Sequence, residues 1–515
     1  MNSLLNTPLD QTLSDAWKQF DPAYKRAFFI VIGISLLAFG FEMTNLILHH
    51  DDLYQIFIQD TILGHYLGRF GVGRLHYYTQ NAYIMPFLQM AEGIVFTAGY
   101  GLVMARFWGA RRTLDIALIA SIVCVFPFMA QVYQYNTSMA TYSLAHLLVA
   151  LAVMLSTRAT IIHVALAAVL YTAAFSIYQS VIANAATIFL FWVLAGILFG
   201  DEREIPLSRA VTKSTLAALA AAGAGGIIYL AAVSSMHLKF DSSQAAGQAF
   251  SLGHKLNLSY LSYALTEILH GTRSFFLWPE SYFPNYLKKL QLVLLVSAFA
   301  LCLWLPKGAI KKVGAVAILA LSLFAPRMLQ FLHAGGHYHN LTLTAYAVVV
   351  AGSVMIINRA ASVLARNAAI LLVSFLLAGY ILQCNWISTV NYLNDRAHFN
   401  TLTQILARIR SVPDIQWDGK KVTVVGSYNM PSAYPFKPAT GVASQYMDAV
   451  RMQYLARLMR DEITFVAADQ TTPKALEYAA THAPWPHPNS FGIVDGIGVL
   501  VLSKEPAKAG EQPEQ

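Results

Sequence analysis

The chain has 515 residues, of which 56% are hydrophobic and only 12% are charged, and its mean hydropathy is +0.50. This composition argues against a water-soluble core and predicts a bundle of membrane-spanning helices. The net charge of +8 does not indicate a nucleic-acid partner, because the basic residues are scattered through short loops between apolar segments. The three cysteines lie within or at the end of apolar runs without ligand spacing, so neither a disulfide framework nor a zinc site is expected.

The chain begins with a polar N-terminal segment, residues 1–26, followed by the first apolar run, Ala27–Leu48. This run is too long for the core of a signal peptide and has no small-residue cleavage pattern after it, so we expect a retained anchor.

Apolar stretches of about 17–23 residues predict about eleven spans within residues 27–384. They begin near Ala27, Pro86, Leu114, Thr137, Ile161, Tyr178, Thr215, Leu290, Val313, Leu341 and Ala368. Lys and Arg concentrate in alternate connections and before the first span, which predicts a cytoplasmic N-terminus. An odd number of spans then puts the C-terminus outside the cytoplasm.

Two adjacent carboxylates, Asp51 and Asp52, follow the first span directly and stand beside His49 and His50. At this depth either carboxylate can act as general base toward a hydroxyl on a lipid-linked sugar. The alternative is that both are ordinary solvated residues at a helix exit. The sequence does not choose between Asp51 and Asp52.

Two long external loops, residues 49–85 and 237–289, carry apolar residues at helical spacing and predict amphipathic helices in the membrane interface. Arg69 and Arg74, in the first of these loops, are candidates to hold a phosphate or sugar, or they form only a basic turn. Lys288 and Lys289 end the second loop and are further candidates for a phosphate. These helices would cover a cavity above the bundle.

Polar groups also interrupt later spans. The turn at Tyr178 and Gln179 is a candidate for hydrogen bonds to a sugar, or it is simple end-capping. Arg327 lies inside the ninth apolar run, where a charge is costly unless it is paired or bound to a ligand. Arg327 is a candidate to bind the phosphate of a lipid carrier, together with three histidines in the loop that follows: His333, His337 and His339. Three histidines so close together can also bind a metal, but the Gly-rich spacing does not favour it.

The tail, residues 385–505, has a different pattern. Amphipathic helices are predicted at Phe399–Ile409, Met447–Met459 and Pro473–Ala480, and strands at Lys421–Gly426, Ile463–Ala467 and Gly498–Leu502. We therefore expect a small extracytoplasmic α/β domain, followed by a disordered segment at 506–515.

The first helix ending at Asp51-Asp52, the following Gly68-Arg69-Phe70, the Tyr178-Gln179 turn, the number of spans and the α/β tail together resemble a known family. The chain is similar to the serotype-converting O-antigen glucosyltransferases of the Gtr type, whose plan is that of the GT-C glycosyltransferases. The resemblance implies an enzyme of the bacterial inner membrane with a periplasmic active site. It also implies transfer of glucose, or a related sugar, from a polyprenyl-phosphate donor to a lipid-linked O-antigen acceptor.

Carried onto this sequence, the resemblance places the catalytic carboxylates at Asp51 and Asp52. Some GT-C enzymes bind a metal with a second carboxylate in the next external turn, but residues 131–136 contain no acid here. A metal-independent, inverting transfer without any cofactor is therefore expected. The alternatives are a transferase for another sugar, such as arabinose or mannose, and a transporter or flippase for lipid-linked sugars. A transporter or flippase would predict inverted repeats, which the sequence does not show.

Overall fold

The structure is a computed structural model. It describes residues 8, 11, 14–15, 18–49, 52–53, 56–57, 68–80, 84–200, 207–236, 257–278, 282–331, 338–360, 362–412, 421–430, 446–469 and 471–504. The chain forms two compact units. Unit 1 comprises residues 1–43, 60–133 and 138–385, and unit 2 comprises residues 44–59, 134–137 and 386–515.

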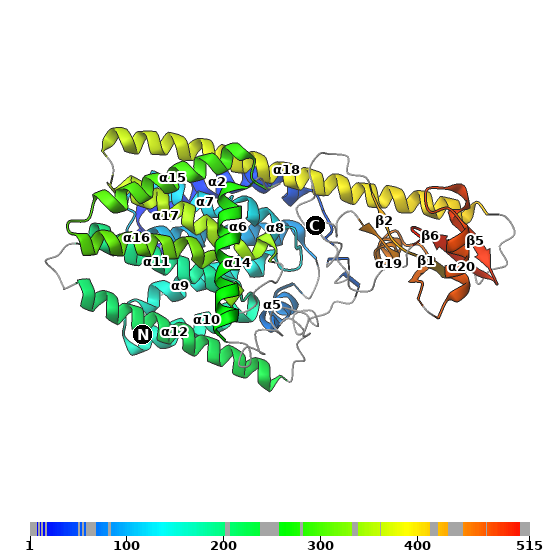
Figure 1. Ribbon diagram of the computed structural model, residues 1–515, viewed down its shortest axis with the longest axis horizontal. Helices are drawn as coiled ribbons and strands as arrows, with labels where there is room; N and C mark the ends of the chain where they lie inside the picture. Colours follow the sequence, from blue (N-terminus) through cyan, green and yellow to red (C-terminus); the bar gives the residue numbers. More distant parts are fainter. Residues whose placement is uncertain are drawn as a thin grey trace. The chain divides into compact units, whose positions relative to one another are not determined.

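Unit 1 is a helical bundle (Figure 1). Its helices are α2 (Pro22–Thr44), α5 (Phe70–Gln80), α6 (Pro86–Phe107), α7 (Thr113–Cys124), α8 (Pro127–Tyr133), α9 (Met139–Ser156), α10 (Ile161–Ile177), α11 (Val181–Phe199), α12 (Leu207–Ser235), α14 (Leu258–Leu277), α15 (Asn285–Trp304), α16 (Ala309–Phe324), α17 (Ala345–Ala360) and the first part of α18 (Val363–Arg410), together with the 3₁₀ turns η2 (Ala325–Phe331) and η3 (Asn340–Leu343).

Nine helices in the described part of the chain are long and apolar enough to cross a membrane. The pair α7 and α8, which bends by 56° where Pro127 begins the second helix, makes ten if the two helices together form one span. The apolar helix α10, with 17 residues, accounts for the remaining predicted segment. The predicted polytopic helical fold with a small α/β domain is confirmed, and such helices are those of a membrane protein.

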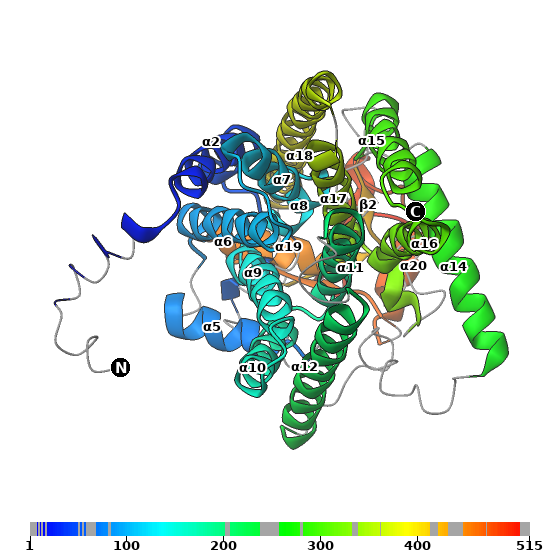
Figure 2. The same cartoon turned by 90° about the vertical axis from the view of Figure 1, so that its left-hand side faces the viewer.

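The bundle is layered around α17 (Figure 2), whose apolar stretch is 89% buried. The peripheral helices α2, α12, α15 and α16 bury only 22–33% of theirs. Their outer faces present large apolar side chains such as Leu37, Ile227 and Val313, each more than 60% exposed. Such a surface is stable only against lipid.

Helix α14 runs across the direction of the other helices of the bundle (Figures 1 and 2). The helix buries Ile268, Phe275 and Phe276, whereas Leu258 and Leu265 are exposed. The amphipathic helix predicted in the second external loop is therefore present. The surface helices predicted in the first loop fall mostly outside the described residues.

Unit 2 contains a four-stranded sheet in the order β4-β1-β6-β5 and a separate two-stranded pair, β2 with β3. The strands are β1 (Lys421–Val425), β2 (Tyr428–Asn429), β3 (Tyr446–Met447), β4 (Thr464–Ala467), β5 (Phe491–Val494) and β6 (Ile497–Val501), and the helices are α19 (Ala449–Leu458) and α20 (Pro473–Thr481). Strand β1 pairs in parallel with β4 and β6, and β5 pairs antiparallel with β6. Asp495 and Gly496 both adopt positive φ at the β5–β6 turn, as a tight hairpin requires.

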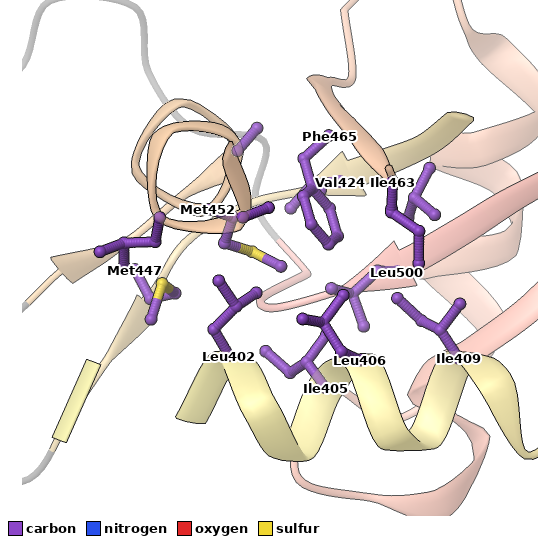
Figure 3. Packing of buried hydrophobic residues seen from close by; sticks show 14 of the residues in the cluster. Leu402, Ile405, Leu406, Ile409, Val424, Met447, Met452, Ile463, Phe465 and Leu500 are labelled. Carbon is purple, nitrogen blue, oxygen red and sulfur yellow. The ribbon is translucent and has the colours of Figure 1, made fainter. Parts of the chain in front are cut away.

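The last helix, α18, has 48 residues and contributes to both units. The sequence predicted a final span and a separate helix at Phe399–Ile409, but nothing between them is a glycine or proline, so the helix continues unbroken. In unit 2, Leu402, Ile405, Leu406 and Ile409 of α18 pack against the sheet and α19 (Figure 3).

Helices α6 and α7 approach closely at Gly101. A Cβ atom added there would lie 2.6 Å from the Cα of Ala120, a distance that only movement of the backbone can relieve. The same addition at Gly33 of α2 meets nothing within 4 Å.

We expect Gly101→Ala to lower the melting temperature of the purified protein by roughly 5 °C or more, because the two helices must separate. Gly33→Ala is the matched control and should leave the melting temperature equal or slightly higher, since alanine favours helix. Equal melting temperatures for both variants would contradict the close contact between α6 and α7.

Candidate functional site

Asp52 is fully buried in unit 2 and binds two separate segments of the chain. Its Oδ2 accepts hydrogen bonds from the backbone N of His49 (3.0 Å), the Nδ2 of Asn136 (2.7 Å) and the backbone N of Asn136 (3.4 Å). Its Oδ1 accepts from the backbone N and the hydroxyl of Thr137, at 3.3 and 3.5 Å. The Asn136 amide also donates to the carbonyl of Ile47 at 2.7 Å.

Five donors thus converge on the two carboxylate oxygens of Asp52. An ionised carboxylate offers about four lone pairs, so its accepting capacity is used inside the protein. This geometry supports a role in bracing residues 47–49 and 52 against 136–137. The other predicted carboxylate, Asp51, lies outside the described residues.

Three residues that the sequence analysis singled out separately meet in unit 1: Arg69, Tyr178 and Gln179. Arg69 donates from NH1 to the hydroxyl of Tyr142 at 2.7 Å and from Nε to Oε1 of Gln179 at 3.4 Å, and its guanidinium lies 5.1 Å from the centre of the Tyr178 ring. Tyr142 and Tyr178 are stacked at 4.4 Å. The Gln179 amide donates to the hydroxyl of Tyr229 at 2.8 Å.

Protein groups engage the side chains that the sequence predicted to bind a sugar. Tyr178 is fully buried, and both ends of the Gln179 amide are engaged by protein groups. The cluster therefore holds Arg69 in place between α9 and the α10–α11 turn.

Arg327 lies on η2, the 3₁₀ turn that replaces the end of α16 at Pro326. Its Nε donates to the hydroxyl of Tyr346 at 3.0 Å, and this hydroxyl donates to Thr272 at 3.3 Å. The guanidinium rests on the backbone of α14 at Gly271, where an added Cβ would lie 2.3 Å from NH1. Tyr346 is itself fixed by stacking on Phe275, with 3.8 Å between ring centres.

The terminal nitrogens of the Arg327 guanidinium, NH1 and NH2, make no hydrogen bond or ion pair within the part of the chain that the structure describes. The Arg327 side chain is half-buried. Lys288 approaches the same helix, because its ammonium donates to the carbonyl of Trp278 and lies 5.8 Å from the Phe275 ring. The structure thus brings both predicted cations to neighbouring turns of α14.

The remaining candidates are not gathered here. Lys289 and His339 are exposed, and Arg74 is an exposed residue of α5 whose guanidinium lies 5.9 Å from the centre of the Phe70 ring. His333 and His337 lie outside the described residues.

A buried hydrogen-bond chain, not predicted from the sequence, lies next to both arginine sites. The Nδ1 of His146 donates to the carbonyl of Tyr142 at 2.7 Å, which leaves Nε2 to accept from the hydroxyl of Thr344 at 3.0 Å. Asn184 donates to the same hydroxyl at 3.1 Å and accepts from the hydroxyl of Tyr100 at 3.0 Å. Tyr142 contacts Arg69, and Thr344 is two residues before Tyr346. Polar side chains inside otherwise apolar runs were the available signal.

Both arginine sites lie at one end of the bundle, because the chain of contacts runs through the first turns of α9, α11 and α17. Basic side chains also gather at the other ends of these helices. There, Arg359 donates to the carbonyl of Trp108 at 2.7 Å, and Arg366 forms an ion pair with Asp115 at 3.1 Å.

No group of three or more His, Cys, Asp or Glu side chains in the described segments is arranged to hold a metal ion. The polar groups assembled at this end of unit 1 are cations, amides and hydroxyls. Such groups can hold a phosphate and hydroxylated ligands.

Residues 40–357 match the family described as Glucosyl transferase GtrII. The matched range includes Asp52, Arg69, Tyr178 and Arg327, and it ends before α18 and the sheet of unit 2. No curated protein matches the chain in a direct sequence comparison.

We expect Asp52→Ala to lower the melting temperature by roughly 5 °C or more, because it leaves several buried donors without an acceptor. Glu477→Ala, which removes an exposed acid from the same unit, should leave the melting temperature unchanged. Thermal unfolding of the purified variants measures both. An Asp52→Ala protein as stable as the parent would refute the bracing role.

Proposed function

Because the chain belongs to the GtrII glucosyl transferase family, we propose that it transfers glucose from a polyprenyl-phosphate donor to a lipid-linked O-antigen glycan. As a member of this family it is a glycosyltransferase, which takes a sugar donor and a glycan acceptor. The single observation that supports the lipid-phosphate donor best is Arg327, a half-buried cation at one end of an apolar bundle. Two of its nitrogens have no hydrogen-bond partner among the residues that the structure describes.

The geometry of Arg327 suits a phosphate. Tyr346 and Gly271 fix the side chain, so little conformational freedom is lost when a ligand binds. The parallel N–H groups of a guanidinium match two phosphate oxygens, and in apolar surroundings such a pair is stronger than in water. Lys288 of α15 donates to the carbonyl of Trp278 at the end of α14, about two turns beyond Gly271, and adds positive charge to this helix.

The proposed general base is Asp51. The sequence left Asp51 and Asp52 as equal candidates, but the oxygens of Asp52 accept five hydrogen bonds from the protein. Asp52 therefore positions the segment, and Asp51 is the carboxylate that we propose accepts the proton. A base must lie within hydrogen-bond reach of the acceptor hydroxyl.

The proposed reaction is a single displacement at the anomeric carbon. The acceptor oxygen forms a bond to this carbon as the bond to the phosphate oxygen breaks, and the bonding electrons leave with the polyprenyl phosphate. The proton of the acceptor hydroxyl passes to the Asp51 carboxylate, and the configuration inverts. Arg327 stabilises the negative charge that grows on the phosphate, and we propose that no metal takes part.

We propose that the end of the bundle with Arg69 and Arg327 faces the periplasm of a bacterial inner membrane, as does unit 2. Support comes from the basic residues Arg111, Arg112, Arg359 and Arg366 near the opposite helix ends, since positive loops stay in the cytoplasm.

Arg327→Ala should lower kcat/KM for the polyprenyl-phosphate donor by about 10²-fold or more, because it removes charge stabilisation of the leaving phosphate. Arg327→Lys should restore only part of the rate, since an ammonium cannot bind two oxygens at once. Arg273→Ala, an exposed arginine of α14, is the control and should retain activity. Glucosyl transfer in membrane vesicles is the measurement, and normal transfer by Arg327→Ala would exclude this phosphate site.

Asp51→Asn should reduce kcat by about 10²-fold to 10⁴-fold with an unchanged melting temperature, because only proton removal is lost. Asp52→Asn should instead lower the melting temperature, since an amide replaces an acceptor that faces several donors. Both are measured on purified protein by transfer assay and thermal unfolding. The reverse pattern, an inactive but fully stable Asp52→Asn beside an active Asp51→Asn, would assign the base to Asp52.

A further inference from the structure

Helix α18 carries a row of buried polar residues within unit 2. Asn391, Asp395 and His398 stand at positions i, i+4 and i+7 and so share one face of the helix. Their exposed fractions are 6%, 6% and 0%. The half-buried Asn394 borders this face, since the four residues fall within about 100° of the helix circumference.

Several buried atoms of this polar face have no hydrogen-bond partner in the structure. They are both side-chain atoms of Asn391, Oδ1 of Asp395 and Nδ2 of Asn394. Folded proteins satisfy nearly all buried polar atoms, because an unpaired one costs about as much as a lost hydrogen bond. Four such atoms within five residues indicate that a polar ligand completes this face.

The chemistry of these atoms selects the kind of ligand. Asn391 Oδ1 and Asp395 Oδ1 accept hydrogen bonds, whereas the amide nitrogens of Asn391 and Asn394 donate them. An anion would be repelled by Asp395. A metal cation would meet two amide N–H₂ groups and the buried Arg451 of α19, which acts electrostatically on Asp395. Hydroxyl groups, which both donate and accept, match the whole set.

The surroundings of Asp395 support such a ligand. The residue lies about 48 Å from the start of α18, beyond the roughly 30 Å of a membrane core. Burial raises the pKa of its carboxyl to about 6, although Arg451 and Arg396 act in the opposite direction. A hydroxyl that donates to this carboxylate would offset the loss of water around it.

We propose that Asn391, Asn394 and Asp395 form a saccharide-binding subsite for a sugar residue of the acceptor glycan. The choice of the acceptor as the source of this sugar rests on the proposed function. The half-buried Asn394 marks the side from which the sugar approaches. Toward the C-terminus of α18 the same face becomes apolar at Leu402, which packs in the core of unit 2 (Figure 3).

The test measures binding of the soluble O-antigen repeat, released from its lipid, to the full-length protein in detergent by calorimetry. Asn391→Ala should weaken this binding by about tenfold, as expected when hydrogen bonds to a ligand are lost. It should also raise KM for the acceptor with kcat within about twofold, and it should not lower the melting temperature. Asn400→Ala, an exposed asparagine of the same helix, is the matched control and should change none of these quantities.

Unchanged saccharide binding in Asn391→Ala would overturn the subsite. It would mean that buried water, and not a sugar, binds the unpaired atoms. If Asn391→Ala does not fold, Asp395→Asn provides the same comparison, with the acceptor oxygen kept and the charge removed. It should weaken saccharide binding severalfold, and wild-type affinity would overturn the proposal. A different result would contradict the proposed function and not the subsite: wild-type protein that binds the repeat but transfers no glucose from a polyprenyl-phosphate donor.

Discussion

A polar group between apolar helices is costly unless another group satisfies it, and this constraint organises the bundle. His146, Thr344, Asn184 and Tyr100 are kept among the spans because each donates to or accepts from the next. These hydrogen bonds join α9, α11 and Thr344 next to the helix starts that carry Tyr142 and Tyr346, the tyrosines that contact Arg69 and Arg327. The two terminal nitrogens of Arg327 have no partner among the described residues, and we propose that a ligand satisfies them.

The two arginines have different environments although both lie at the same end of unit 1. Arg69 is surrounded by two tyrosine rings and the Gln179 amide, so its main effect is to join α9, α12 and the α10–α11 turn. Arg327 has one tyrosine partner and a glycine beneath it. An identical side chain is therefore enclosed by protein groups in one place, whereas in the other it is the residue that we propose binds a phosphate.

Much of the fold could be predicted from the sequence, because hydropathy and helical periodicity reflect the solvent that each segment meets. The spans, α19, α20, β1, β4 and β6 were all predicted near their observed positions. Strand β5 was missed because Phe491–Val494 is too short to show alternation. Arg327 was found because a charge in an apolar run is conspicuous. The partners of Asp52 were not predicted, because Asn136 and Thr137 lie 84 and 85 positions away along the chain and are ordinary turn residues.

Unit 2 is assembled from pieces that are far apart in the chain, and this has a consequence for biosynthesis. Leu48 and Leu53, which flank Asp52, share a core with Leu402, Ile405 and the sheet strands. The ribosome makes these partners only after every preceding span has been inserted into the membrane. Leu48 and Leu53 therefore lack these apolar neighbours until α18 and the strands are made, although Asn136 and Thr137, which bind Asp52, are made earlier. A truncated polypeptide that ends before α18 has no such core, and completion of the C-terminal sequence is the step that first covers these two leucines.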